Sequence, residues 1–485
     1  MITRWICEKD NKKWIYPIEK CIYCKGPITK QKSTEAKVIG VTKVNIPSPM
    51  HPIIPYNIIL LEDKYGNRLP KKTMKKYKIG DTYSLEKAKT ESAVIVSKVK
   101  YNILESLKEC FELLNDYKIN EGDKFLIKPS IIEPAYSYQT VNTNPAVLDA
   151  LISYLKEKKV DIVVGEQSMP GNDVIAGAKK SGILSICKKH EVPFIDLSKS
   201  EYIKNEDTGF MIAKEVMERR VINVPVLKTN SEMSISGAME NMIRVASQST
   251  QKKIFDNNVD KELPKLIKSL PGFISIGDGT IGMHGQGPTS LGEPAFLNRI
   301  FLSKDSVALD SVFAESCMIN TPDYVIEGSN LKIGISDIKE IEIVGYELDA
   351  LKYPLKIADK DSSFHPRIKI INGKADPGTF SSAMKVTSKL FGISGYEMNI
   401  AIGNNLTKEM FEGKERVVAF GDCAIKKINE IGVDVIGEIP DELDDLEKLV
   451  LIKAILENVD KKSISIGDKL KSKLAKLAVK IKKTF

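Results

Sequence analysis

The stretch KFLIKPSIIEPAYSYQTVNTNPAVLDALISYLKEKKVDIVVG, residues 124–165, decides the fold of the central part of this chain. Its first nine residues, 124–132, are mostly apolar and predict a buried strand. Capping side chains at 143–144 precede Pro145 at the first helical position, which predicts a helix to Lys159. The apolar residues 160–165 predict a second buried strand.

Strands and helices continue to alternate beyond this stretch. Residues 174–189 predict a helix, and Asp305 is placed to cap another that ends at Cys317. Further strands are predicted at 193–197, 221–227, 273–277 and 300–303. The alternation predicts a largely parallel sheet covered by helices on both faces. We therefore assign residues 93–358 to a central α/β domain.

The region before this domain has a different character. Residues 1–90 contain many prolines and short β-rich runs, including 37–44 and 56–61. A hairpin turn is predicted at residues 65–67, and the polar stretch 84–92 is typical of a linker.

After the central domain, residues 359–468 predict a small α/β unit. Its expected strands and helices are 400–403, 417–420, 424–431, 433–436 and a helix starting at Pro440. Residues 469–485 hold seven lysines and no acid. Leu470, Leu474, Leu477 and Ile481 recur at helical spacing, so we predict a basic amphipathic tail that lies on an anionic membrane surface, on an acidic partner or on its own domain.

Composition limits the classes of protein. The 485 residues are 42% hydrophobic and 28% charged, which is typical of a globular protein with several domains. We expect a cytoplasmic protein, because no apolar run is long enough to span a membrane and the first residues lack a secretory signal. Seven of the eight net positive charges come from the tail, so the nearly neutral remainder does not favour nucleic acid as a partner.

Four side chains near the start have the spacing of a ribbon with two facing knuckles: Cys7, Asp10, Cys21 and Cys24. A tetrahedral zinc ion is usually held by thiolates in such a ribbon, and a carboxylate can replace one of them. The alternative is a knuckle that packs around Trp5 and Trp14 without metal.

Residues 64–78 contain seven basic and no acidic residues. Lysine and arginine side chains of this kind can bind phosphates. Three interpretations stand at this point: a nucleic-acid surface, a site for a phosphorylated cofactor, and a solvated loop.

The knuckles together with residues 38–70, VIGVTKVNIPSPMHPIIPYNIILLEDKYGNRLP, resemble the domain-of-unknown-function 35 family. Members of that family are acyl-CoA-associated partners of thiolases and related condensing enzymes. The resemblance implies a zinc ribbon at 1–36 and an OB-type β-barrel at 37–90. It also implies that the phosphates of CoA contact the basic side chains Arg68, Lys71, Lys72 and Lys75. Asp10 departs from the family's cysteines, which puts the metal in question rather than the fold.

Three segments of the central domain carry candidate chemistry. Polar residues follow predicted strands, where open α/β sheets bind ligands, and residues 277–292 contain six glycines that allow close backbone approach to an anion. The candidate catalytic residues are Lys228, Glu240, Asp278 and His284. The candidate substrate-binding residues are Thr143, Asn144, Asn230 and Asn241, with Gly285 and Gly287 assigned to a cofactor. A structural loop is an equal alternative for the glycines, and a surface or hydrogen-bonded loop histidine is the alternative for His284.

Four motifs in this domain resemble the domain-of-unknown-function 362 family, which is often attached to iron–sulfur modules. They are NVPVLKT (223–229), GAMEN (237–241), DGTIGMHGQGP (278–288) and LSKDSVALDSV (302–312). The resemblance covers about residues 93–345 and supplies no general reaction to transfer. It implies histidines where this chain has Asn144, Asn230 and Asp256, and a lysine where it has Glu240. Because imidazole is a common metal ligand and acid–base group, a metal site of the family would be lost or altered here.

Cys423 follows a predicted strand and opens a helix, where a thiolate is favoured. It is a candidate nucleophile or cluster ligand, with a small core residue as the alternative. The local sequence resembles a cluster-associated unit, but it supplies too few cysteines for four-thiolate ligation, so we do not expect an iron–sulfur cluster.

The leading hypothesis is an accessory or catalytic protein for acyl-CoA or another acyl thioester, working with a thiolase-like condensing enzyme. Lys228 would stabilise an enolate or oxyanion, and Glu240 or Asp278 would move a proton. The first alternative is a metal- or iron–sulfur-dependent redox enzyme. The second is a single-stranded nucleic-acid binder that uses the barrel. The sequence specifies neither the acyl substrate nor the oligomeric state.

Overall fold

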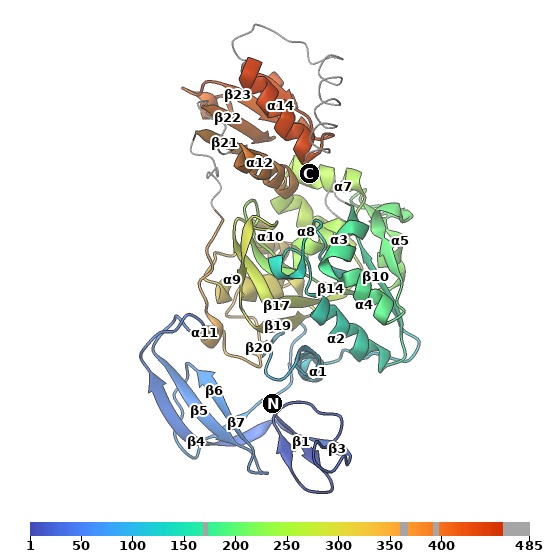
Figure 1. Ribbon diagram of the computed structural model, residues 1–485, viewed down its shortest axis with the longest axis vertical. Coiled ribbons are helices and arrows are strands. Elements are labelled where there is room, and N and C mark those ends of the chain that lie inside the picture. Colours follow the sequence, from blue (N-terminus) through green and yellow to red (C-terminus); the bar gives the residue numbers. More distant parts are fainter. Residues whose placement is uncertain (168–172, 359–366, 391–396, 459–485) are drawn as a thin grey trace. The chain divides into compact units, whose positions relative to one another are not determined.

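The computed structural model describes residues 1–167, 173–358, 367–390 and 397–458 (Figure 1). The chain is a mixed α/β protein with several sheets, and it divides into two compact units, Met1–Ala358 and Asp359–Phe485. No helix among the described residues has the length and apolar character needed to cross a membrane.

Two antiparallel sheets form the N-terminal part of the larger unit. The first has the order β2-β1-β3, with β1 (Ile2–Cys7), β2 (Lys13–Trp14) and β3 (Ile28–Ser33). The second has the order β6-β5-β4-β7, with β4 (Glu35–Val44), β5 (Tyr56–Glu62), β6 (Arg68–Thr73) and β7 (Thr82–Ser84). The predicted hairpin turn is confirmed between β5 and β6, where Asp63 accepts hydrogen bonds from the backbone of Tyr65 and Asn67. A closed OB-type barrel remains a prediction.

The central sheet is mostly parallel, as predicted. Its main path is β11-β10-β9-β14-β17-β19-β8-β20. The strands are β8 (Val94–Lys98), β9 (Lys124–Pro129), β10 (Asp161–Glu166), β11 (Phe194–Asp196), β14 (Arg220–Val224), β17 (Phe273–Gly285), β19 (Arg299–Ser303) and β20 (Ile343–Val344). Only β19 runs against its neighbours β17 and β8. Three short strands extend the sheet beside β17: β15 (Val226–Asn230), β16 (Ser234–Ser236) and β18 (Gly292–Ala295).

Helices pack on both faces of this sheet (Figure 1). On β9, Phe125 and Ile127 join one apolar cluster while Leu126 joins the other, because successive strand residues point to opposite faces. One cluster includes residues of α1 (Ile103–Leu113), α2 (Pro145–Lys156), α3 (Val174–Ser181) and α4 (Ile183–Lys189). The other includes residues of α5 (Lys214–Glu218), α6 (Ala238–Asn241), α7 (Gln248–Asn257), α8 (Val259–Ser269), α9 (Ser306–Ser316) and α10 (Asp323–Asn330).

Several predicted boundaries in this unit are wrong. The single helix expected at 174–189 is two helices, because Gly182 adopts a left-handed conformation between them. The strand expected at 221–227 is broken at Pro225, which cannot donate to a sheet ladder. The strand expected at 273–277 continues to Gly285 as β17. Helix α2 ends at Lys156 rather than Lys159.

The smaller unit contains a four-stranded parallel sheet. Its order is β21-β22-β23-β24, with β21 (Ile368–Gly373), β22 (Met398–Gly403), β23 (Val417–Phe420) and β24 (Gly437–Ile439). Its helices are α12 (Pro377–Lys389), α13 (Asp422–Ile431) and α14 (Asp445–Asn458).

Two predictions for this unit are wrong. The strand expected at 433–436 lies at 437–439, and the helix expected from Pro440 begins at Asp445. Asp444 accepts hydrogen bonds from the backbone N–H groups of Leu446 and Glu447 and so stabilises the start of that helix. The predicted basic tail, 469–485, lies outside the described residues.

We expect Phe313→Ala to lower the free energy of unfolding by about 3–5 kcal/mol, because it empties a fully buried position. Phe313 is 0% exposed and contacts Phe301 edge to face. The matched control is Phe296→Ala, at a side chain that is 59% exposed, for which we expect a change within about 0.5 kcal/mol. Denaturant unfolding followed by circular dichroism measures both. Equal losses in the two variants would contradict the assignment of the core.

Candidate functional site

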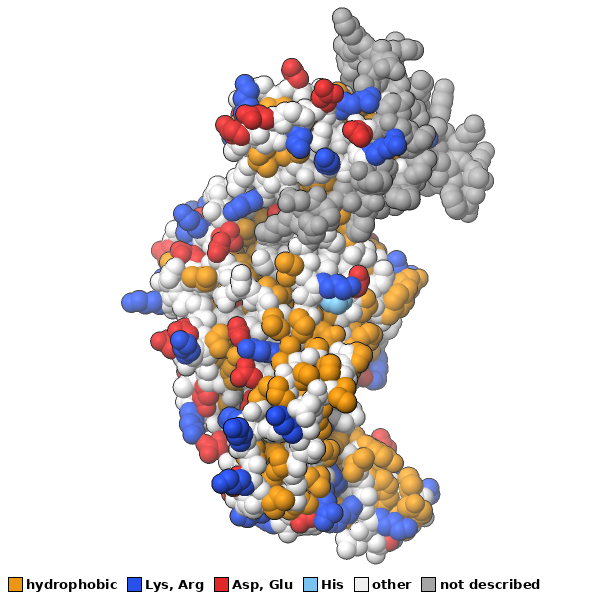
Figure 2. Space-filling view, turned by 90° about the vertical axis from the view of Figure 1, so that its left-hand side faces the viewer, with side chains coloured by type: hydrophobic (Ala, Val, Ile, Leu, Met, Phe, Trp, Pro, Cys, Tyr) orange, Lys and Arg blue, Asp and Glu red, His pale blue; other side chains and the backbone are white. Residues whose placement is uncertain are grey.

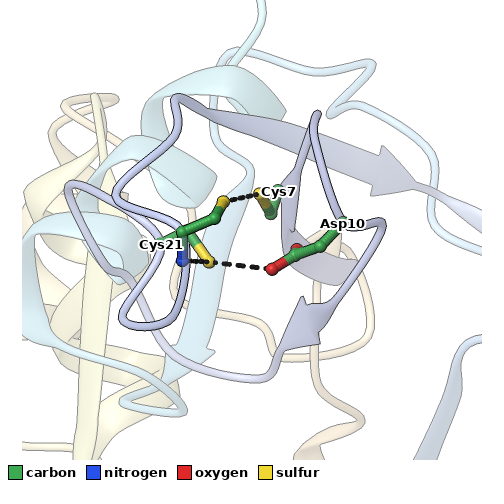
Figure 3. Close-up of side chains that lie close together, drawn as sticks. Cys7, Asp10 and Cys21 are labelled. Atoms are coloured by element: carbon green, nitrogen blue, oxygen red, sulfur yellow. Dashed lines mark hydrogen bonds between the residues drawn. The ribbon is translucent and has the colours of Figure 1, made fainter.

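The predicted knuckles bring their four side chains together. Cys7 ends β1, Asp10 lies in the turn that follows, and Cys21 and Cys24 lie in the loop before β3. One ligand atom from each lies within 4.8 Å of all the others. Figure 3 shows Cys7, Asp10 and Cys21 directed toward one another. The Sγ atoms of Cys7 and Cys24 are 3.3 Å apart, and Cys21 Sγ donates to Asp10 Oδ2 at 3.3 Å.

This donor set fits zinc, which binds thiolates and carboxylates in tetrahedral geometry. Hydrogen bonds from the thiols lower the pKa of Asp10, and the backbone N–H of Gly26 lowers the pKa of Cys24. These two shifts favour the charged forms of Asp10 and Cys24, whereas burial raises the pKa of Cys7 to about 12. Trp5 and Trp14 pack beside Cys7 and Cys21, so the packing predicted as the alternative is present together with the ligand geometry.

A second group of polar side chains lies in the central domain, where the order of the parallel strands reverses. The chain passes from β9 to β10 and β11 in one direction and then continues with β14 and β17 on the other side of β9. Ligands of open α/β sheets bind at the carboxyl ends of the strands at such a point. Here the hydroxyl of Thr143 accepts from Ser130 N and donates to Val224 O, both at 2.7 Å, and so joins the ends of β9 and β14.

Lys228 lies at this edge of the sheet, and its side chain is fully buried. Its ammonium donates to the carbonyls of Val141 at 2.7 Å and Pro288 at 3.2 Å. Burial lowers the pKa of Lys228 to about 8, although the neighbouring carboxylates of Glu240, Glu133 and Glu166 act in the opposite direction. A buried lysine that titrates near neutral pH is typical of functional sites.

A second buried lysine was not predicted from the sequence. Lys128 is the penultimate residue of the apolar strand β9 and lies 2.8 Å from Glu166 at the end of β10, with both side chains at most 1% exposed. Burial lowers the pKa of Lys128 and raises the pKa of Glu166. A lysine and a glutamate at the ends of two consecutive apolar strands were the signal that could have found this pair.

Two buried polar atoms near these residues have no hydrogen-bond partner in the described part of the chain: Ser231 Oγ, directly after β15, and Gln167 Oε1, directly after β10. Buried polar atoms are usually satisfied, so orphans at the edge of a sheet indicate a place where a ligand can bind. We name the cluster of Lys128, Glu166, Lys228 and Glu240 the switch-point cluster.

Asp278 has a different position from the one expected of a proton carrier. It accepts hydrogen bonds from the backbone of Asn144 at 2.9 Å and from the hydroxyl of Thr280 at 2.6 Å. Burial raises the pKa of Asp278. Asn144 caps α2 with its side-chain oxygen and donates to Thr280 through its amide. Both residues therefore fasten α2 to β17 next to the switch-point cluster.

The predicted amides also hold backbone in place. Asn230 accepts from the backbone of Glu232 and Met233 and donates to Ser236, and Asn241 donates to Asn223 and to the Pro129 carbonyl. These contacts occupy the groups that were predicted to bind substrate.

The glycine-rich loop packs against the sheet. A side chain at Gly287 would come within 2.1 Å of the Thr229 carbonyl, and the N–H of Gly285 donates to Lys356 O. His284 accepts a hydrogen bond from Lys356 N at 3.4 Å, and burial lowers its pKa. The glycines therefore allow close packing of the loop.

The basic residues predicted to bind phosphate do not form one patch. Arg68 pairs with Glu62 at 2.7 Å, and Lys75 is exposed. Lys71 is buried, donates to Gly345 O and lies 3.9 Å from the ring of Tyr346. Lys72, by contrast, lines a cavity between β6 and the central domain. Part of this stretch, for which a solvated loop was one of three interpretations, is strand β6, whose alternation turns consecutive lysines to opposite sides.

Residues 125–315 match the model of a family described as "Domain of unknown function (DUF362)". The predicted resemblance of the central domain is therefore confirmed over that range. No curated protein matches the chain. A solved structure titled "Ltp2-ChsH2(DUF35) aldolase" is similar to 18% of this chain and 73% of its own chain, at 20% identity and a TM-score of 0.15. A likeness that weak does not support an assignment of function.

We expect the purified protein to contain about one zinc ion per chain and Cys21→Ser to lose it, because three remaining ligands bind less tightly. Asp10→Cys should keep the metal. Elemental analysis gives the stoichiometry, and chelation should lower the melting temperature of the wild type and of the variants that keep the metal, but not that of Cys21→Ser. Cys423→Ser, at a cysteine outside the cluster, is the control. Unchanged zinc in Cys21→Ser would contradict the site.

We expect the stability of the protein to depend on pH through the buried carboxyl group of Asp310. It accepts from the backbone of Ala238 and Met239, and burial raises the pKa of Asp310 to about 7. The folded state then keeps a proton that the unfolded chain loses above about pH 4, so stability falls as pH rises from about 4 to 7. Asp310→Asn should remove about 2–4 kcal/mol of the stability change between pH 4 and pH 7, whereas Asp207→Asn, at an exposed acid, should not change it. Urea unfolding across this range measures the difference, and parallel profiles for Asp310→Asn and wild type would contradict it.

Proposed function

We propose that this protein binds an acyl thioester such as acyl-CoA, with the switch-point cluster holding the acyl end. The observation that carries the proposal is the buried ammonium of Lys228, which lies at the carboxyl edge of the sheet among three carboxylates. An ammonium in a water-poor site stabilises the negative oxygen of a thioester enolate. A neighbouring carboxylate can accept the proton that leaves the α-carbon of the thioester when the enolate forms.

The charges of the cluster support binding of a neutral, polar group. Lys128 is already paired with Glu166, and Lys228 uses two of its three protons on backbone carbonyls. One N–H of Lys228 is left for a ligand oxygen. A thioester carbonyl needs one such donor, and Glu240 is the carboxylate whose charge acts most strongly on Lys228.

A thiolase-like condensing enzyme is the partner we propose. The face of this protein that contacts the enzyme would include the loop between β4 and β5, where Ile46 and Met50 are 81% and 50% exposed. Figure 2 shows hydrophobic side chains gathered on one face of the molecule, including the lower part that holds the N-terminal strands. Exposed apolar surface of this kind is typical of protein contacts.

We expect the wild type to bind acetyl-CoA, and a non-hydrolysable ketone analogue that keeps the acyl oxygen, more tightly than free CoA. Lys228→Met should reduce this preference at least tenfold, because it removes the donor to the acyl oxygen, while Lys252→Met, at an exposed lysine, should leave it unchanged. Isothermal titration calorimetry measures the dissociation constants of the wild type and of both variants. Absence of acyl-CoA binding by the wild type, or an unaltered preference in Lys228→Met, would refute the proposal.

A further inference from the structure

The register of two strands brings two cations together. Lys98 ends β8 and Arg299 begins β19, and the antiparallel pairing places them directly opposite each other. Opposed residues of an antiparallel pair have their side chains on the same face. Like charges in this position destabilise a sheet, so the pair needs a compensating partner.

That partner is not present among the described residues. Arg299 is 4% exposed and donates to the carbonyls of Leu297 and Leu351, which carry no net charge. Lys98 has a distant ring contact with Tyr346, at 5.9 Å. Burial, Arg299 and Lys72 together lower the pKa of Lys98 to about 8.

The cations face a cavity of about 200 Å³. Lys72 reaches it from β6, and His51 lies on its wall. Lys352 lines it as well, but that side chain already pairs with Glu315 and Asp349. The lining contains no acidic residue. Because one water needs about 10–15 Å³, the space is large enough for a small anion.

The cavity lies at the edge of the sheet where ligands of such folds bind. Strand β8 runs parallel to β17, since β19 is antiparallel to both, so Lys98 lies at the same carboxyl edge as the switch-point cluster. Asn298 on the cavity wall donates to the Thr280 carbonyl, and the Thr280 hydroxyl bonds to Asp278. The two sites are therefore connected through β17.

We infer that Lys72, Lys98 and Arg299 form a binding site for the phosphate or diphosphate group of a phosphorylated ligand. Phosphate offers several acceptor oxygens and the negative charge that the three cations lack, and arginine can bind it through two parallel N–H groups. If the ligand is acyl-CoA, its diphosphate lies here, and that identification alone rests on the proposed function.

The test measures binding of pyrophosphate and inorganic phosphate to the full-length protein by calorimetry and thermal shift, with chloride at equal ionic strength as the reference. We expect pyrophosphate to bind and to raise the melting temperature. Lys98→Gln should weaken binding at least tenfold while melting no lower than the wild type without ligand, because it removes the like-charge contact. Lys43→Gln, which removes one charge at an exposed position of β4, should behave as wild type. Lys72→Gln is the second variant if Lys98→Gln does not fold, with the same loss expected.

Two results would overturn the site: no effect of either anion beyond that of chloride, or full pyrophosphate affinity in Lys98→Gln. Competition with CoA distinguishes the sources of the phosphate. Displacement of pyrophosphate by CoA, with both weakened in Lys98→Gln, supports the site and the acyl-CoA ligand together. Pyrophosphate binding without displacement by CoA supports the site and counts against acyl-CoA. Acyl-CoA binding that Lys98→Gln leaves unchanged overturns the site and leaves the proposed function standing.

Discussion

The hydroxyl of Thr143 bonds to two strands at once, and the arrangement of the central domain depends on it. It accepts from Ser130 N after β9 and donates to Val224 O at the end of β14. The parallel ladder of β9 and β14 ends at Pro129 and Val224, and the hydroxyl pairs with two buried backbone groups at that end. Asn144, the next residue, then caps α2. The segment 141–144 thus joins the ends of β9 and β14, caps α2 and supplies the Val141 carbonyl that accepts a hydrogen bond from Lys228.

Stability does not explain the buried charges of the switch-point cluster. Burial of the Lys128–Glu166 pair removes both charges from water, and such a pair adds little net stability over apolar residues of the same size. Removal of one partner, however, would leave a buried charge uncompensated. A pair of this kind is expected where the position and charge of a group matter more than its contribution to folding, and its location at the carboxyl edge of the sheet agrees with that role.

Apolar runs and capping signals predicted the alternation of strands and helices, because burial and backbone hydrogen bonding are local properties of the sequence. The start of α9 at Asp305 and the hairpin turn after β5 followed from single residues. Boundaries failed where a backbone conformation decided them, as at Gly182. The site was harder to predict: Lys228 was identified, but Lys98 and Arg299 come together only through the pairing of strands about 200 residues apart. The pairing of Lys98 with Arg299 cannot be predicted from the residues next to either of them in the sequence.

The two groups of cations at this edge of the sheet differ in one respect that bears on function. Lys128 and Lys228 lie among glutamates of the same chain, so their charge is compensated before any ligand arrives. Lys98 and Arg299 face a cavity whose described walls carry no carboxylate. The desolvation of a charge is offset only by an opposite charge or by solvent. In the first group the compensating charges belong to the fold, and in the second the cations are compensated by solvation, by dissolved anions or by a bound ligand. A fold that keeps both arrangements along one edge of a sheet is suited to a molecule with a polar end and an anionic end.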